Sequence, residues 1–262
     1  MVAETRSPLK GKPLRLPGQS VQEERDRLIN DVASEWILFS AFAIAFALFE
    51  WYRWVMNVPP SPWLLTGVAA IVVGIAVFKV RRLLPRLRAL RQAAEGERAV
   101  GQYLEGLREQ GYRVFHDLVG DDFNVDHVLV GPTGVYTVET KTWSKPKSGK
   151  SELVHDQEGI KVLGREPDRD PVVQALAQAQ WVQRLLLEST GKKVFVRPVV
   201  AFPGWFVTRT TGANRDVWVL EPKALPAFLE KEQARLADED VKLCAYHLSR
   251  AIRAREALTE KR

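Results

Sequence analysis

The sequence predicts an α/β protein with a mixed central sheet flanked by helices, preceded by an apolar helical segment. From about residue 95 onward, short runs rich in Val, Thr and aromatic residues alternate with helical patterns. Two long apolar runs occupy residues 36–56 and 63–80. A polar stretch with three prolines precedes them, and we expect residues 1–30 to form a disordered tail.

Length and composition set wide limits. The chain has 262 residues, which is enough for one sizeable domain and an appendage. Its net charge of +6 is compatible with a phosphate-bearing partner or an anionic membrane face, and does not choose between them. The only cysteine, Cys244, excludes an intrachain disulfide and fits a reducing compartment.

The two apolar runs predict a transmembrane hairpin within residues 31–83. Each run approaches the ~20 residues that span a hydrocarbon core. The connector NVPPSP between them is short. Aromatic residues that favour the headgroup layer lie near the run ends: Trp36, Trp51, Tyr52, Trp54 and Trp63. The alternative, two buried helices of a soluble domain, is less compatible with these features.

The charged flanks predict an orientation. The segment KVRRLLPRLRALR after the second run carries six cations and no acid, whereas the connector has no Lys or Arg. The positive-inside rule therefore places both termini in the cytoplasm of a multi-pass protein of the cell or inner membrane. Pro85 should kink or end any helix that leaves the bilayer. Gly67 and Gly74 are spaced for self-association into a homo-oligomer.

A helix is predicted over EGERAVGQYLEGLREQG, ending at the cap residue Gly111. Its apolar stripe, Val100, Leu104 and Leu107, extends backwards to Glu97. An acid therefore lies in line with the buried face. The alternative is that Glu97 is an acid of the first helical turn, favoured there by the helix dipole.

The remaining elements follow an order of strands and helices that indicates an α/β domain at 84–262. A second helix has Asp170 as its N-cap, Pro171 at its first position and Gly191 at its end. The strands are expected at 112–119, 124–131, 134–142, 193–202 and 216–220, and residues 151–164 are expected to form strand pieces about a central turn, with helices over 222–262.

The hairpin NVDHVLVGPTGVYTVETKTW carries unusual acids. Glu139 and Lys141 share one face of a strand, and Asp126 on the preceding arm can approach Glu139. Carboxylates are ligands for Mg²⁺ or Mn²⁺, with the Thr140 carbonyl as a further candidate. Lys141 can orient a water or stabilise developing charge. A structural Asp126–Lys141 ion pair, with Glu139 at an exposed strand end, remains the alternative.

This pattern resembles the PD-(D/E)XK nuclease superfamily, and within it the nuclease-related domain (NERD) family, over about residues 95–205. Three segments carry the resemblance: GERAVGQYL, the hairpin with its D-x(12)-E-x-K spacing, and the glutamine-bearing helix DPVVQALAQAQWVQRLL. The resemblance implies a restriction-endonuclease-like fold. The literal Pro-Asp pair is absent, because Val125 precedes Asp126.

The resemblance also implies roles for individual residues. Glu97 would be the acid of the first helix near the metal, and Asp126 and Glu139 would be metal ligands. Lys141 would be the catalytic lysine. Gln174 would reach toward the site from the helix after the hairpin, and Gln178, one turn further, is a weaker candidate.

Other polar residues have simpler expected roles. His127 follows Asp126 and so should point to the other face of the sheet, where it packs or hydrogen-bonds. Three lysines follow the hairpin and either contact a nucleic-acid backbone or are merely solvated: Lys145, Lys147 and Lys150.

The function expected from these features is a membrane-anchored nuclease that hydrolyses DNA phosphodiester bonds with Mg²⁺ or Mn²⁺, using metal-activated water and no covalent intermediate. Its partners would be DNA and the lipid bilayer. Two alternatives remain open. One is a catalytically inactive module that holds nucleic acid at the membrane, and the other is a membrane scaffold that binds protein.

Overall fold

A computed structural model of the chain describes residues 14–59, 62–120, 123–145, 151–162 and 170–259. The chain divides into two compact units. The first unit contains residues 1–20 and 93–262, and the second contains residues 21–92. The C-terminal part of the first unit thus begins at Ala93 and not at residue 84, and the unit includes a segment from the N-terminus that was not predicted to belong to it.

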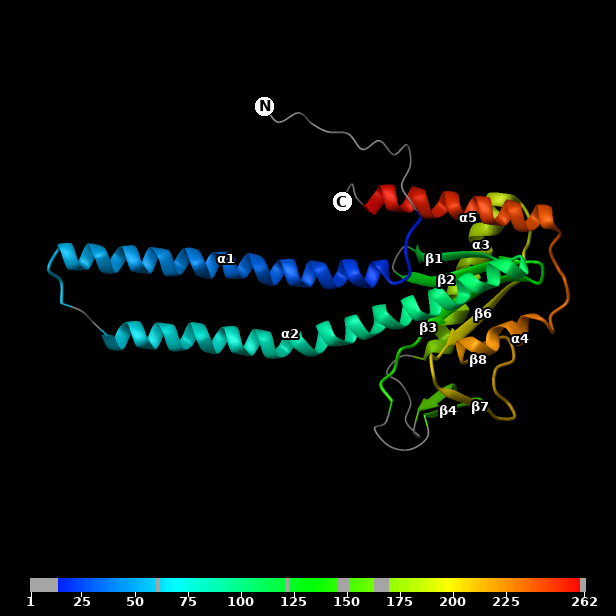
Figure 1. Cartoon of the computed structure of the whole chain (residues 1–262), viewed down its shortest axis with the longest axis horizontal. Helices are drawn as coiled ribbons and strands as arrows, with labels where there is room; N and C mark the ends of the chain where they lie inside the picture. Colours follow the sequence, from blue (N-terminus) through cyan, green and yellow to red (C-terminus); the bar gives the residue numbers. More distant parts are fainter. Residues whose placement is uncertain (1–13, 60–61, 121–122, 146–150, 163–169, 260–262) are drawn as a thin grey trace, which may run out of the picture. The chain divides into compact units, whose positions relative to one another are not determined.

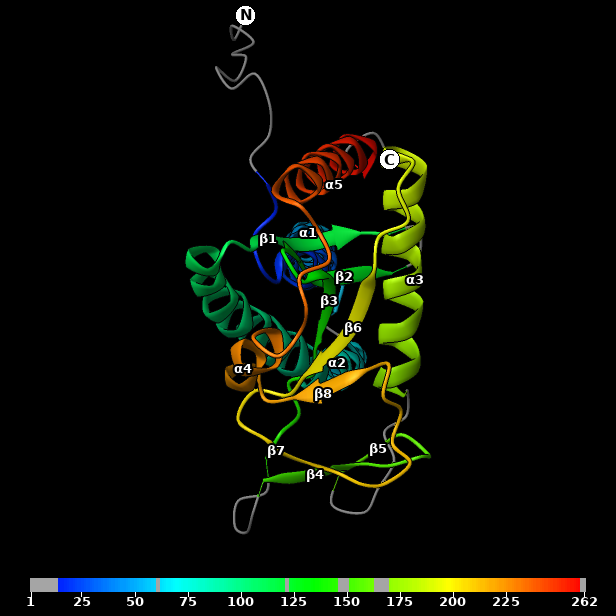
Figure 2. The same ribbon diagram turned by 90° about the vertical axis from the view of Figure 1, so that its right-hand side faces the viewer.

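A five-stranded mixed sheet forms the centre of the first unit, in the order β1-β2-β3-β6-β8 (Figure 2). The first three neighbours are antiparallel, and β6 joins β3 in parallel after a crossover that includes helix α3. The bounds are β1 Arg113–Val119, β2 Asn124–Gly131, β3 Gly134–Thr140, β6 Val196–Ala201 and β8 Trp218–Leu220.

Helices cover both faces of this sheet. On one face, α3 (Pro171–Thr190) and α5 (Asp238–Thr259) pack their apolar side chains on the strands. On the other face lie the last turns of α2, the short helix η1 (Gly106–Gln110) and α4 (Leu225–Leu229), which follows η2 (Pro222–Ala224). Figure 2 shows these two sets on opposite sides of the strands. The predicted α/β class, with helices on both faces of a mixed sheet, is therefore confirmed.

The helix ends follow the sequence signals. Asp170 caps α3, its side chain accepting a hydrogen bond from the Val172 amide, and Gly191 ends the helix in the left-handed conformation. Gly111 likewise takes a φ of 86° after η1. Because these caps depend on local chemistry alone, the sequence predicted them correctly.

A second, three-stranded sheet in the order β5-β4-β7 lies beside the first and was only partly predicted. Its strands are β4 Glu152–His155, β5 Ile160–Val162 and β7 Phe206–Arg209. The hairpin of β4 and β5 matches the predicted strand pieces, but β7 pairs in parallel with β4 across about fifty residues of sequence. That pairing has no local signal, so the sequence did not indicate it.

The second unit consists of most of α1 (Gln19–Val55) and of α2 (Pro62–Glu105) (Figure 1). Both helices are longer than the predicted apolar runs. The tail predicted for residues 1–30 is corrected, because α1 already begins at Gln19. Pro85 lies inside α2 and does not end it.

Across the described parts of these helices, no stretch is long and apolar enough to span a bilayer. The structure therefore lends no support to the transmembrane hairpin predicted at 36–56 and 63–80. Each helix instead extends beyond its apolar run. Charged residues precede the apolar run in α1 and follow it in α2.

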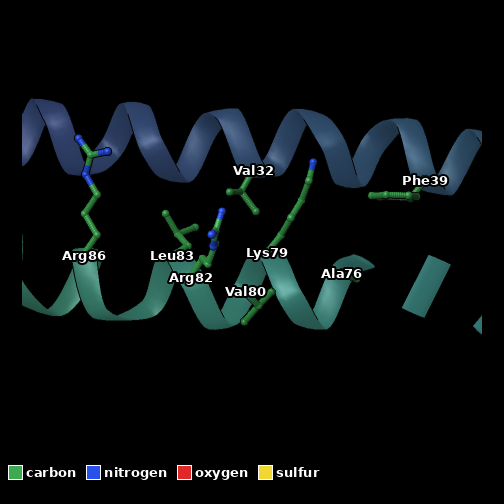
Figure 3. A pocket seen from close by; sticks show the side chains of 8 residues that line it. All are labelled: Val32, Phe39, Ala76, Lys79, Val80, Arg82, Leu83 and Arg86. Atoms are coloured by element: carbon green, nitrogen blue, oxygen red, sulfur yellow. The ribbon is translucent and has the colours of Figure 1, made fainter. Parts of the chain in front are cut away.

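A cavity of about 300 Å³ lies between α1 and α2 within the second unit. Figure 3 shows the long side chains of Lys79 and Arg86 extending from α2 toward α1. The cavity combines apolar and basic groups: Val32, Phe39, Ala76, Lys79, Val80, Arg82, Leu83 and Arg86. We refer to it below as the basic cavity.

Candidate active site

The β2–β3 hairpin brings its acids together at one end of the sheet. Gly134 begins β3 directly after the turn, and its φ of +135° is open only to glycine at little cost. His127 pairs with Val138, and continuing this register places Asp126 opposite Glu139. The Thr140 amide donates a hydrogen bond to Asp126 Oδ2 at 2.7 Å. Asp126 is therefore fixed against the end of β3.

Lys141 lies just beyond β3 and is held by two partners. Its Nζ donates to Glu139 Oε1 at 2.6 Å and to Gln174 Oε1 of α3 at 2.9 Å. Glu139 is buried, with 4% of its surface exposed. The predicted approach of Glu139, Lys141 and Gln174 is thus present in the structure, although the partner of Lys141 is Glu139 rather than Asp126.

Gln178, one turn after Gln174, binds the second oxygen of Glu139. Its Nε2 donates to Glu139 Oε2 at 2.6 Å and also contacts the Asn124 carbonyl at 2.8 Å. The spacing of four residues puts Gln174 and Gln178 on the same face of α3. Gln178, the weaker candidate by sequence, therefore makes the direct contact to the buried carboxylate. The i, i+4 glutamine pair was the signal that could have ranked it higher.

Glu97 reaches the same site from α2. Its burial, with 7% exposed, continues the buried stripe of Val100 and Leu104 as predicted. Gly96 allows the helix to come close, because a Cβ there would lie 1.9 Å from Thr142 Oγ1. The small residue before Glu97 thus determines how near this acid lies to the end of β3.

The carboxylates of the site influence one another. Burial, together with the neighbouring charges of Asp117 and Glu139, raises the pKa of Glu97 to about 8, while Lys141 opposes the shift. Desolvation inside the domain raises the pKa of Asp126 well above its ordinary value, with Glu139 and Glu97 adding to the effect. Three acids therefore crowd around one ammonium group, and the site favours added positive charge.

The histidines lie on a different hydrogen-bonded path. His127 Nδ1 lies 2.9 Å from His116 Nδ1, and His116 Nε2 lies 2.8 Å from Glu105 Oε1. Burial lowers the pKa of His127 well below its usual range. As predicted, His127 is a packed, hydrogen-bonded residue.

The oxygen atoms of the site are of the kind that bind a hard divalent cation. Carboxylate oxygens of Asp126 and Glu139 lie beside the Thr140 backbone. The Oε1 atom of Gln178 is buried and, among the described residues, has no hydrogen-bond partner. Within those residues, however, no three His, Cys, Asp or Glu side chains are grouped closely enough to hold an ion. The arrangement is thus a two-carboxylate site and not a preformed cluster.

The basic loop after the hairpin is described only at its start. Lys145 is exposed, and its Nζ occupies the space that a Cβ at Gly204 would need. Lys147 and Lys150 lie outside the described residues.

The structure adds one acid that was not among the predicted site residues. Asp117 on β1 is 1% exposed and lies near enough to Glu97 to raise the pKa of that carboxyl group. Its partners are Arg15 and Ser20. Because these residues are about a hundred positions away, no local pattern could have identified the contact.

Comparison with known families and proteins gives one match. Residues 92–203 match the family model of the nuclease-related domain. The resemblance stated from the sequence is thereby confirmed, and the PD-(D/E)XK superfamily is consistent with this family. Comparison of the chain with curated proteins and with solved structures found no match.

Proposed function

From the match of residues 92–203 to the nuclease-related domain, we propose that this protein is a divalent-metal-dependent nuclease that hydrolyses DNA phosphodiester bonds. The observation that carries the proposal is the site at the end of β3. There, Lys141 Nζ lies 2.6 Å from the buried Glu139, while Asp126 accepts the Thr140 amide. A lysine bound to a buried carboxylate, beside a second acid, suits phosphoryl chemistry.

Asp126 and Glu139 would hold the metal, together with the Thr140 carbonyl. A bound Mg²⁺ or Mn²⁺ ion would polarise a phosphate oxygen and lower the pKa of a coordinated water. When a cation binds beside it, Glu97 would release its proton and add negative charge to the site. Its raised pKa, about 8, reflects the same concentration of acids.

The protein's own residues would position the reacting groups. Lys141 has three N–H donors, of which two go to Glu139 and Gln174 in the described structure. The third can donate to a non-bridging phosphate oxygen, or to the attacking water. Gln178 would keep Glu139 in one orientation through its hydrogen bond to Oε2.

The test is cleavage of plasmid and linear DNA by the full-length protein with Mg²⁺, with Mn²⁺ and with EDTA. We expect products only with metal. Glu139→Gln and Lys141→Met should each reduce the rate by about a hundredfold or more, because each removes a charged group from the reacting centre.

Lys161→Ala is the matched control. Lys161 also pairs with acids, Asp156 and Glu158, but on the second sheet. Its loss should leave cleavage unchanged. Equal product release by the wild type and the Glu139→Gln variant would refute a nuclease site at this position.

A second candidate is a non-catalytic nucleic-acid-binding module. The observation that favours it is the lack of a three-ligand cluster among the described residues. This candidate predicts DNA binding that weakens with salt and survives Glu139→Gln, with no cleavage under any metal condition.

We also propose that the second unit holds the protein at a membrane, with the nuclease-related domain on the cytoplasmic side. Large apolar side chains are exposed along α1 and α2, among them Phe42, Trp51, Trp63 and Ile71. The basic cavity provides positive charge on the same two helices. Fractionation of cells that express the full chain tests this proposal. Recovery in the soluble fraction would contradict it, and release from membranes by carbonate would indicate peripheral attachment.

A further inference from the structure

The pairing of β1 with β2 is interrupted at the site acid. His116 pairs with His127 and Leu118 with Val125, but the intervening pair, Asp117 opposite Asp126, is missing from the ladder. Asp117 has a φ of 52°, which is rare for a residue other than glycine. The break therefore coincides with the position of Asp126.

The side-chain alternation of both strands slips at this break. Phe115 and Leu118 are three residues apart, yet both belong to the core cluster under α3 and α5. Val125 and Val128 behave in the same way on the partner strand. In a regular strand, residues three apart point to opposite faces. In both strands, therefore, the alternation of side chains between the two faces of the sheet is interrupted at the same place, where the pair of aspartates is missing from the ladder.

A segment from the N-terminus holds Asp117 in this conformation. We call residues 15–20 the N-terminal arm. Arg15 Nε donates to Asp117 Oδ2 at 2.7 Å, the Ser20 amide donates to the same oxygen at 2.9 Å, and the Ser20 hydroxyl bonds to Oδ1. Arg15 and Asp117 are 5% and 1% exposed. Figures 1 and 2 show the segment before α1 beside β1.

The arm also packs on the helix that carries Glu97. A Cβ added to Gly101 of α2 would lie 2.5 Å from Pro17 Cγ. Gly18 lies against Ala94, and a Cβ there would be 3.6 Å from the Cβ of Glu97. The arm therefore touches both α2, which carries Glu97, and β1, which pairs with the strand that carries Asp126.

We propose that the N-terminal arm is a structural part of the active site, in which Arg15 and Ser20 hold Asp117 in the left-handed conformation and thereby fix the Asp126 carboxylate at the Thr140 amide. Arg15, Ser20 and Asp117 are positioning residues. The arm lies outside the segment that matches the nuclease-related domain. The proposal rests on the proposed function for its catalytic meaning, although not for its structural part.

The physical reason is that the break does not maintain itself. An aspartate in the left-handed region is strained, and such conformations persist only where surrounding contacts determine them. Without the arm, β1 and β2 can pair regularly, with Asp117 directly opposite Asp126. Two carboxylates would then lie side by side on one face, and their repulsion would displace Asp126.

Hydrogen exchange at the Thr140 amide tests the structural part, because this amide is bound to Asp126 Oδ2. The full-length Arg15→Ala variant should exchange this amide about tenfold faster or more than the wild type. The matched control is Arg197→Ala, which breaks the partly buried pair with Glu232 elsewhere in the same unit. The control should leave Thr140 exchange at the wild-type rate. Equal exchange in the wild type and Arg15→Ala would overturn the proposal.

A second variant distinguishes a specific effect on Asp126 from a general loss of folding in Arg15→Ala. Arg15→Ala/Asp117→Gly removes the unpaired acid, and glycine takes the left-handed conformation without strain. The double variant should restore slow exchange at Thr140. Fast exchange in the folded double variant would show that the backbone at residue 117 does not position Asp126, and would also overturn the proposal.

DNA cleavage by the same proteins tests the catalytic part. Arg15→Ala should lower kcat about tenfold or more with little change in KM, Arg15→Lys should recover part of it, and Arg197→Ala should match the wild type. If the wild type does not cleave DNA, the proposed function fails while the exchange measurement still decides the role of the arm. Unchanged kcat in Arg15→Ala would overturn the catalytic part.

Discussion

Two polar clusters of the first unit bury carboxylates. In one cluster the positive and negative groups are balanced, and in the other the acids are in excess. At the arm, one acid, Asp117, meets one buried arginine and two further donors from Ser20. At the end of β3, the acids Glu97, Asp126 and Glu139 share the single ammonium group of Lys141.

The difference distinguishes a cluster that stabilises the fold from one that can bind a proton or a cation. A carboxylate that already has an adjacent cation and a full set of hydrogen-bond donors gains little by binding an additional ligand. Crowded acids with raised pKa values are destabilising unless a proton or a cation joins them, and such groups concentrate at functional sites. The balanced cluster lies beside the unbalanced one and, in our proposal, supports it.

The largest effect is expected when the balanced cluster is broken. Arg15→Ala leaves Asp117 buried without its charge partner, and we expect a loss of about 3–5 kcal/mol in the free energy of unfolding. Urea denaturation measures it. Lys192→Ala, which breaks the exposed pair with Asp240, should leave the free energy of unfolding nearly unchanged. A similar small loss for both variants would mean that burial of the Arg15 pair has no energetic consequence.

Added metal should act on the unbalanced cluster alone. At a hundredfold excess over Kd, an ion that binds only the folded chain stabilises it by about 2.7 kcal/mol. Thermal unfolding of the wild type should therefore shift upward with Mg²⁺, whereas an Asp126→Asn/Glu139→Gln variant should not respond. If neither Mg²⁺ nor Mn²⁺ shifts the thermal unfolding of the wild type, the result would argue against a cation site.

Removing an acid from the unbalanced cluster should stabilise the fold. The pKa of Glu97 rises from 4.5 to about 8 on folding, so the folded state binds the proton more tightly and wild-type stability falls as pH rises between these values. Glu97→Gln abolishes this dependence. We expect the variant to gain on the order of 1–3 kcal/mol over the wild type at pH 8, and much less near pH 4.5. Denaturation at both pH values checks the sign, and a variant less stable than the wild type at pH 8 would contradict it.

The smallest effect tests how α2 brings Glu97 to the site. Gly96→Ala places a methyl group 1.9 Å from Thr142 Oγ1, so the helix must shift and we expect a cost of about 1–2 kcal/mol. Gly106→Ala, just beyond α2, meets open space and should change stability by less than about 0.5 kcal/mol. Equal effects of the two substitutions would show that the close approach at Gly96 does not matter.

The site was predictable to the extent that it is local. Glu139 and Lys141 share a face because strand side chains alternate, and the Gln174 helix was marked by Asp170, Pro171 and Gly191. The spacing within the hairpin also placed Asp126 opposite Glu139. The direct role of Gln178 was underestimated, because only the packing angle of α3 decides which glutamine meets the buried carboxylate.

Sequence alone determined the elements of this protein: an α/β domain, its helix caps, a hairpin with two acids and a lysine, and two long apolar runs. Such features follow from periodicity and capping within a few neighbouring residues. Only the tertiary structure decided that Arg15 pairs with Asp117, that β7 joins β4, and that the strand ladder breaks at Asp126. Contacts between residues far apart in the chain depend on how the packed elements meet, and no local pattern encodes that.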